Sequence, residues 1–227
     1  MHLPQGSTFV DGGAHFGDTT ITMALYARET LNRNDLRFVA IEPNTEKAQW
    51  IRECAAANGF NEDTIRVVEC VLGDETALSS ATVRKSRYCK YDGRISYEWT
   101  DCSNDNEKEN HSTTSNEDDE LLFDVRKLDD FYDIIHPLGF LHLDVEGWEH
   151  AALQGASALL SAPKPGGRAY ILAECFTFEQ ARRRGPGFSL VQEHDIMSVM
   201  MKYPEFTREE DLVDEERNLF FVRKGSC

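Results

Sequence analysis

Three acids and one histidine in the second half of the sequence lie within or next to apolar runs. They could act in catalysis or in metal binding. Asp144, Glu146 and Glu174 could together hold a divalent metal such as Mg²⁺, which acidifies a substrate hydroxyl. His142, on the same strand face as Asp144, could instead act as a general base, because its unperturbed pKa lies near neutrality. In a third arrangement the acids only position a substrate and a cationic ligand. The residue types leave these three arrangements open.

A glycine turn near the beginning of the chain could bring backbone close to a ligand. Residues 8–20 predict a short strand, a sharp turn through three glycines and the start of a helix. The spacing Asp11-x-Gly13-x-x-x-Gly17 differs from the G-x-G-x-x-G of dinucleotide sites. A carboxylate before the glycines would repel a pyrophosphate, so it suits a cationic ligand or an amine. A purely structural turn is the alternative interpretation.

A second acid is placed for a nucleoside. Residues 37–44 read as a buried strand ending in Glu42, followed by an amphipathic helix over residues 45–58 that Gly59 closes. In a βαβ unit, the acid at the end of the second strand lies beside the ribose of a nucleoside held by the first turn. Its two oxygens can then accept hydrogen bonds from both ribose hydroxyls. The plainer interpretation is a solvated acid at a strand end.

Five segments in a fixed order carry a resemblance to a known family. They are Val10–Gly17, Ala40–Asn44, Val71–Asp74, Leu128–Asp130 and Leu141–Glu149, and the run Asp144-Val-Glu-Gly-Trp-Glu149 is the most specific part. Through these segments the sequence resembles the FkbM family of S-adenosylmethionine (SAM)-dependent methyltransferases, within the class I Rossmann-like group. The family usually has lysine where this chain has His142, and it has a shorter connection in place of residues 101–120.

The resemblance implies SAM as the cofactor and assigns residues to its binding site. The implied cofactor-binding residues are Asp11, Gly13, His15, Gly17, Asp18, Thr19, Glu42, Asn44, Cys70, Val71 and Asp144. Among them, the first turn would lie under the methionine end, Glu42 would bind the ribose, and Cys70 and Val71 would line the adenine. Beside them, the strand-end positions give Asp144, Glu146 and His142 as candidate catalytic residues. Asp144, Glu146 and Glu174 are the candidate metal ligands.

Strands that alternate with helices predict the fold. Further strands are expected at residues 64–72, 140–145, 169–174, 205–213 and 218–222, and further helices at residues 148–160 and 190–201. The pattern predicts a doubly wound, mostly parallel seven-stranded α/β sheet with helices on both faces. Residues 77–83 and 94–99 predict a small antiparallel β insertion. Asp18 or Thr19 is expected to cap the first helix.

One domain is expected to account for residues 1–227, with an acidic insertion at about 101–120. That insertion contains eight acids, one lysine and no apolar residue except Cys102. A segment of this composition buries too little surface to order itself, so we expect a flexible loop or a lid that orders on a partner. The basic run Arg182–Arg184 could contact an anionic or polyhydroxyl substrate, or it could be a solvated helix end.

Composition limits the partners and the compartment. The net charge of −16 argues against a nucleic-acid partner. The sequence contains no apolar run of about 18 residues that could span a membrane. The first residues lead directly into the first strand and leave no room for a signal peptide, so we expect the six cysteines to be reduced thiols in a cytoplasmic protein. No oligomeric state is predicted.

The sequence therefore predicts a SAM-dependent methyltransferase that acts on a hydroxyl of a small metabolite, sugar or polyketide-like acceptor. Oxygen as the acceptor atom rests on the resemblance, and nitrogen or a carboxylate stays open. The alternative from another class is a nucleoside- or SAM-binding module without catalysis, or a subunit that needs a partner to complete its pocket. An oxidoreductase is disfavoured by Asp11 and by the glycine spacing.

Overall fold

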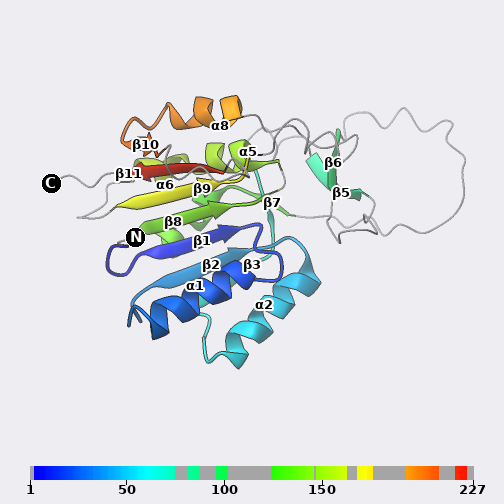
Figure 1. Ribbon diagram of the computed structural model, residues 1–227. Coiled ribbons are helices and arrows are strands. Elements are labelled where there is room, and N and C mark those ends of the chain that lie inside the picture. The colour runs from blue at the N-terminus through cyan, green and yellow to red at the C-terminus, as the bar shows by residue number, and fades with distance from the viewer. Residues whose placement is uncertain are drawn as a thin grey trace, which may run out of the picture.

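The fold is built on a seven-stranded, mostly parallel sheet (Figure 1). The computed structural model describes residues 3–74, 81–86, 96–101, 124–145, 147–162, 168–175, 193–209 and 218–223, with the backbone alone for 81–86 and 96–101. The strand order is β10-β11-β9-β8-β1-β2-β3, and β11 runs antiparallel to both of its neighbours. The doubly wound α/β fold predicted from the sequence is confirmed.

The elements follow one another in the alternating order that such a sheet requires. The main-sheet strands are β1 (Thr8–Gly12), β2 (Arg37–Ile41), β3 (Ile65–Val68), β8 (Leu138–Leu143), β9 (Ala169–Ala173), β10 (Phe206–Arg208) and β11 (Leu219–Arg223). Two small pairs stand outside it: β4 (Val71–Leu72) with β7 (Val125–Arg126), and β5 (Ala81–Ser86) with β6 (Ser96–Asp101). The described helices are α1 (Asp18–Glu29), α2 (Thr45–Ala57), η1 (Leu128–Phe131), α4 (Tyr132–Ile135), α5 (Glu149–Gln154), α6 (Ser157–Ser161) and α8 (Glu193–Met200).

Side chains that alternate along the central strands bury both faces of the sheet. Phe9 and Val10 are neighbours in β1, yet they pack into two different hydrophobic clusters. The cluster around Phe9 includes residues of α1 and α2, whereas the cluster around Val10 includes residues of α4, α5, α6 and α8. Helices therefore cover both faces, which is why the central strands are apolar along nearly their whole length.

The chain reverses its winding direction at β1. This strand pairs in parallel with β2 on one side and with β8 on the other. From β1 the chain first builds outward through β2 and β3, and it returns later to build outward through β8 and β9. A crevice opens at the carboxyl ends of the strands where an α/β sheet reverses in this way, and ligands bind there.

The strand predicted over residues 64–72 is wrong in its second half. β3 ends at Val68. The amide of Val71 then donates a hydrogen bond to the carbonyl of Asp124 at 2.8 Å. Val71 and Leu72 pair with β7 instead of continuing beside β2. The segment that returns from the insertion supplies this partner strand, and the apolar pattern of residues 64–72 cannot show a partner so distant in the chain.

The helix predicted over residues 148–160 is two helices. α5 ends at Gln154, and the carboxylate of Asp129 accepts hydrogen bonds from the amides of Ala158 and Leu159 at 2.8 and 3.0 Å, which starts α6 as a separate helix. At the break, a Cβ on Gly155 would overlap the carbonyl oxygen of Gly73. Gly155 therefore permits close packing at the point where α5 ends.

Several other expectations concern the periphery of the fold. At the end of the helix predicted over residues 190–201, the side chain of Met201 is 78% exposed, whereas Met200 is buried. The expected loop at 101–120 lies outside the described residues beyond Asp101, and so does the basic run Arg182–Arg184.

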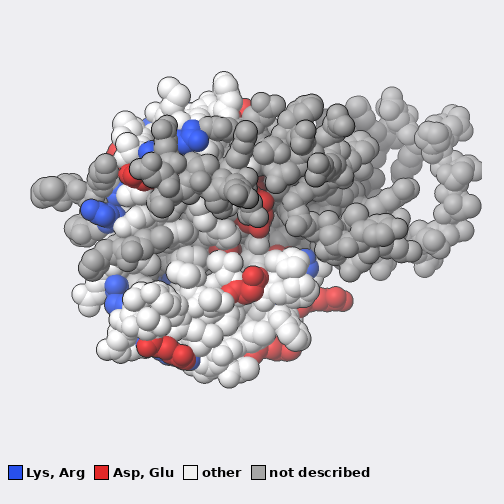
Figure 2. Space-filling view, in the orientation of Figure 1, with Lys and Arg blue, Asp and Glu red and all other residues white. Residues whose placement is uncertain are grey.

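On the face shown in Figure 2, acidic side chains occur near the middle and basic ones mostly toward the edges. Within the described part of the chain, no helix combines the length and the apolar character needed to cross a membrane.

Candidate active site

A pocket of about 410 Å³ lies over the carboxyl ends of the strands at the reversal point. Most of the site residues predicted from the sequence line it: Asp11, Gly13, His15, Asp18, Thr19, Glu42, Cys70, Val71, His142, Asp144 and Glu174. Among the other predicted residues, Gly17 and Asn44 are not part of the lining, and Glu146 lies outside the described residues. The pocket size is in the range of sites for drug-sized ligands.

The glycine turn after β1 lies against the end of β8. Gly13 has φ +83°, and a Cβ on it would overlap the backbone carbonyl of Asp144. Its amide donates to the carbonyl of Ile41 at 2.9 Å, and the amide of Asp144 donates to the carbonyl of Gly12 at 2.9 Å. The turn is therefore held between the ends of β2 and β8, and only glycine fits at residue 13.

Gly17 serves the packing of the first helix. It is the N-cap of α1 in the left-handed conformation with φ +79°, so the expectation that Asp18 or Thr19 caps this helix is wrong. A Cβ at residue 17 would lie 2.8 Å from Cγ1 of Ile51 in α2. The glycine lets the start of α1 approach α2 closely, which leaves Asp18 and Thr19 in the pocket lining.

Asp11 is the central member of a hydrogen-bonded group of three side chains. It is 1% exposed, and its Oδ1 lies 2.8 Å from Nδ1 of His142. Its Oδ2 accepts a hydrogen bond from the hydroxyl of Thr20 at 2.6 Å. Both oxygens of Asp11 are thus engaged within the protein. Thr20 was missed by the sequence reasoning, although it stands at the end of the glycine-rich stretch.

The contact with Asp11 shifts the pKa of His142. Burial acts to lower the pKa of His142, but the hydrogen bond and the negative charge of Asp11 raise it above its ordinary value, and Asp144 and Asp18 add to this effect. When the neutral imidazole donates from Nδ1 to Asp11, its lone pair is at Nε2. An acid that fixes the tautomer of a histidine in this way makes Nε2 the basic atom.

Glu42 is buried and already orders the backbone around it. Its Oε2 accepts a hydrogen bond from the amide of His15, and its Oε1 accepts one from the amide of Asn44, both at 2.9 Å. Burial raises the pKa of Glu42, while the two amide donors and Lys47 act in the opposite direction. Because an ionised carboxylate has about four lone-pair positions, both oxygens can accept further hydrogen bonds from a ligand.

Asn44 has a structural role in this part of the site. Its side-chain oxygen accepts a hydrogen bond from the amide of Lys47 at 3.0 Å, which makes it the N-cap of α2. Its own amide donates to Glu42. It positions Glu42 and the start of the helix from outside the pocket lining.

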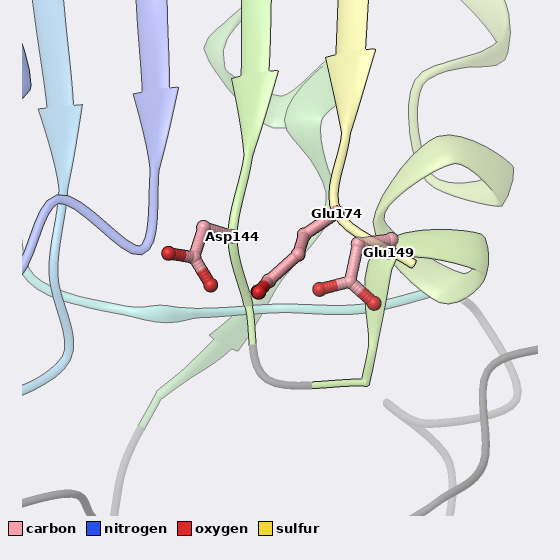
Figure 3. Close-up of side chains that lie close together, drawn as sticks. All are labelled: Asp144, Glu149 and Glu174. Atoms are coloured by element: carbon pink, nitrogen blue, oxygen red, sulfur yellow. The ribbon is translucent and has the colours of Figure 1, made fainter. Parts of the chain in front are cut away.

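Three acids gather at the ends of β8 and β9. Figure 3 shows the carboxylate of Glu174 between those of Asp144 and Glu149, and one oxygen of each residue lies within 4.8 Å of the others. The amide of Glu174 donates to the carbonyl of Leu143 at 2.9 Å, which joins the two strand ends. Two of these acids, Asp144 and Glu174, are among the metal ligands predicted from the sequence, and the third predicted ligand, Glu146, lies outside the described residues. Glu149, the last residue of the Asp-Val-Glu-Gly-Trp-Glu run, was not predicted.

Glu149 is the most deeply buried of these acids. It is 0% exposed, and its Oε1 accepts hydrogen bonds from the amides of Val145 and Gly147 at 2.9 and 3.2 Å. Burial raises the pKa of Glu149 to about 8; the backbone donors lower it, and the charge of Asp144 raises it again. Glu149 is the first residue of α5, so its side chain folds back over the turn that leads from β8.

The strand order, the antiparallel β11 and the pocket at the reversal point define a class I methyltransferase-like α/β protein. The chain belongs to the methyltransferase FkbM domain family, whose model matches residues 11–205. Membership of this family of SAM-dependent methyltransferases implies SAM as the cofactor.

Solved structures share the fold at low sequence identity. Methyltransferase FkbM from Methylobacillus flagellatus aligns with a TM-score of 0.56 and 18% identity, over 98% of this chain and 45% of that one. A putative rRNA methylase from Clostridium thermocellum aligns with a TM-score of 0.50 and 11% identity, over 99% of this chain and 89% of that one. The chain thus spans less than half of the FkbM structure. No curated protein matches the sequence significantly.

Proposed function

We propose that this protein transfers the methyl group of SAM to a hydroxyl of a small acceptor, such as a sugar or a polyketide-like metabolite. The observation that carries the proposal is the 2.8 Å contact between Asp11 and Nδ1 of His142 in a pocket that also contains Glu42. An acid–histidine pair can remove a proton from an oxygen nucleophile. A buried acid at the end of β2 suits the ribose of a nucleoside cofactor.

The transfer is an in-line displacement at the methyl carbon. A lone pair of the acceptor oxygen forms the new O–C bond, while the C–S bond breaks and its electron pair returns to sulfur, which becomes a neutral thioether. The acceptor proton goes to Nε2 of His142, and Asp11 stabilises the imidazolium that forms. Thr20 acts as a positioning residue because it holds the second oxygen of Asp11.

The cofactor assignment supports a division of the pocket into two parts. In the proposal Glu42 binds the ribose, Cys70 and Val71 line the adenine, and the turn at Gly13 lies under the methionine end. Asp18 and Thr19 belong to the same end of the pocket. The acids at the ends of β8 and β9 then face the acceptor, where a divalent cation such as Mg²⁺ would lower the pKa of a bound hydroxyl.

The proposal includes a small-molecule acceptor and a cytoplasmic location. The net charge of −16 disfavours binding to a polyanion such as a nucleic acid. The thiol of Cys70 is buried and reduced, and disulfides are rare in the cytoplasm.

A methyl-transfer assay tests the proposal. The protein is incubated with SAM carrying a labelled methyl group and with panels of hydroxyl, amine and carboxylate acceptors, and release of S-adenosylhomocysteine is measured. We expect release with a hydroxyl acceptor and a labelled methyl ether in the product. Label on nitrogen or on a carboxylate would correct the acceptor atom. A protein whose melting temperature rises with NAD but not with S-adenosylhomocysteine would overturn the cofactor.

Replacing Glu42 with glutamine is expected to weaken SAM binding roughly tenfold to hundredfold. The substitution removes charge-assisted hydrogen bonds to the ribose worth about 1.5–3 kcal/mol. Glutamine keeps an oxygen that can accept from a backbone amide, so the turn is perturbed less than by alanine. Calorimetric titration with SAM measures the effect, and the exposed Glu46→Gln is the control for lost charge on the next helix. Equal affinity in both variants would refute the role of Glu42.

A further inference from the structure

We infer that Asp144, Glu149 and Glu174 form a binding site for one hard divalent cation, with Mg²⁺ as the favoured ion. The three carboxylates come from the end of β8, the start of α5 and the end of β9, and their ligand oxygens lie within 4.8 Å of one another. Figure 3 shows that they point toward a common region. Carboxylate oxygens are the ligands that Mg²⁺ and Ca²⁺ prefer.

The spacing of the oxygens fits a shared ion. Oxygen ligands lie about 2.1 Å from Mg²⁺ and about 2.4 Å from Ca²⁺, so two opposite ligands are about 4.2 or 4.8 Å apart. No pair in this cluster exceeds the larger separation. Small side-chain rotations would bring all three oxygens into one coordination sphere, and water or the acceptor would complete it.

The second oxygen of Glu149 points independently to a ligand. Oε1 of this residue is satisfied by two backbone amides, whereas Oε2 is buried and has no hydrogen-bond partner among the described residues. The residue itself is 0% exposed. A buried carboxylate oxygen without a donor costs stability, and a cation held by the Glu149 carboxylate would offset that cost.

Two of the three acids, Asp144 and Glu149, are not paired with a described basic side chain. No lysine or arginine in the described part of the chain forms an ion pair with Asp144 or Glu149. When all three carboxyl groups are ionised they repel one another, and a divalent ion offsets most of that charge with a compact centre. A lysine ammonium would fit the cluster only if its three N–H donors were directed at the three carboxylates.

The position of the site gives the cation a role that rests on the proposed methyl transfer. Asp144 follows His142 by two residues, just after the end of β8, and both line the pocket. An acceptor hydroxyl bound to the cation would have a lowered pKa and would lie near the basic Nε2 of His142. Binding of the cation itself does not depend on that reaction.

Binding of Mn²⁺ to the metal-free chain of 227 residues tests the inference. Mn²⁺ substitutes for Mg²⁺ and is counted by the loss of its free electron paramagnetic resonance signal, at about 0.15 M KCl so that diffuse attraction to the acidic surface is screened. We expect saturation at one ion per chain and competition by Mg²⁺. Glu149→Gln keeps an oxygen for the two amides but removes the charge, and it should weaken binding at least about tenfold.

Two further variants decide the outcome. Asp144→Asn should also weaken binding at least about tenfold, and it carries the test if Glu149→Gln does not fold. Glu62→Gln removes one exposed charge and should bind as the unaltered protein does. Absence of saturable binding, or unchanged affinity in both site variants, would overturn the inference. Because no turnover is measured, this result is separate from the fate of the proposed methyl transfer.

Discussion

Replacing Gly13 with alanine is expected to destabilise the fold by about 2–5 kcal/mol and to abolish SAM binding. The left-handed backbone, with φ +83°, costs an alanine about 1–2 kcal/mol. The added methyl group would also overlap the backbone carbonyl of Asp144, which costs about 1–3 kcal/mol more because backbone cannot move aside as a side chain does. Moving the turn away from β8 would displace the wall of the pocket. Urea unfolding and calorimetric titration with SAM measure the two effects.

Gly6 provides the matched control for this substitution. It has φ +67°, but a Cβ built on it meets no atom within 4 Å. Gly6→Ala is therefore expected to cost about 1–2 kcal/mol from the backbone alone and to leave SAM affinity unchanged. Similar destabilisation by both alanines would show that the contact with Asp144 relaxes freely, and it would contradict the tight junction between the turn and β8.

The sheet could be predicted from the sequence because its strands carry local signals. Apolar runs of strand length, glycine turns and helical periodicity occur in the order that a doubly wound fold requires. The errors fall where distant residues decide the local structure. β4 leaves the main sheet because β7, more than fifty residues later, offers it a partner. α6 begins separately because Asp129 caps it, and no pattern within residues 148–160 indicates that contact.

The candidate site was predictable to the extent that its residues end strands. Asp11, Glu42, Asp144 and Glu174 each follow or end an apolar run, so the geometry of parallel strands brings them to one edge. Thr20 and Glu149 lie in helices, where the sequence does not show which side chain turns back toward the strand ends. The sequence also did not show that Asp11 is the partner of His142, because this contact depends on the register between β1 and β8.

Replacing His142 with asparagine is expected to lower kcat about 10²–10⁴-fold while SAM affinity stays nearly unchanged. A general base contributes an effect of this size to a reaction in which an oxygen loses its proton. The asparagine amide can still donate a hydrogen bond to Asp11, so the buried carboxylate is not left unpaired. Steady-state methyl transfer and SAM titration separate the two effects, and His194→Asn, at a histidine whose side chain is 84% exposed, is the control. Full activity in His142→Asn would remove the histidine from the mechanism.

Asp11→Asn tests the same base through its partner. The hydroxyl of Thr20 donates to the residue at position 11, so the asparagine oxygen is expected to face Thr20 and its NH₂ group to face Nδ1 of His142. The imidazole must then accept at Nδ1 and carry its proton at Nε2, where no lone pair remains for the acceptor, and kcat should fall about 10²–10⁴-fold. Since Asp11 raises the pKa of His142 above 6.5, the rate of the unaltered enzyme should rise with pH only through that higher pKa. In Asp11→Asn, the pH profile of any residual activity should lack this rise or show it at a lower pH. A variant with an unchanged profile and unchanged kcat would show that Asp11 only holds the fold together.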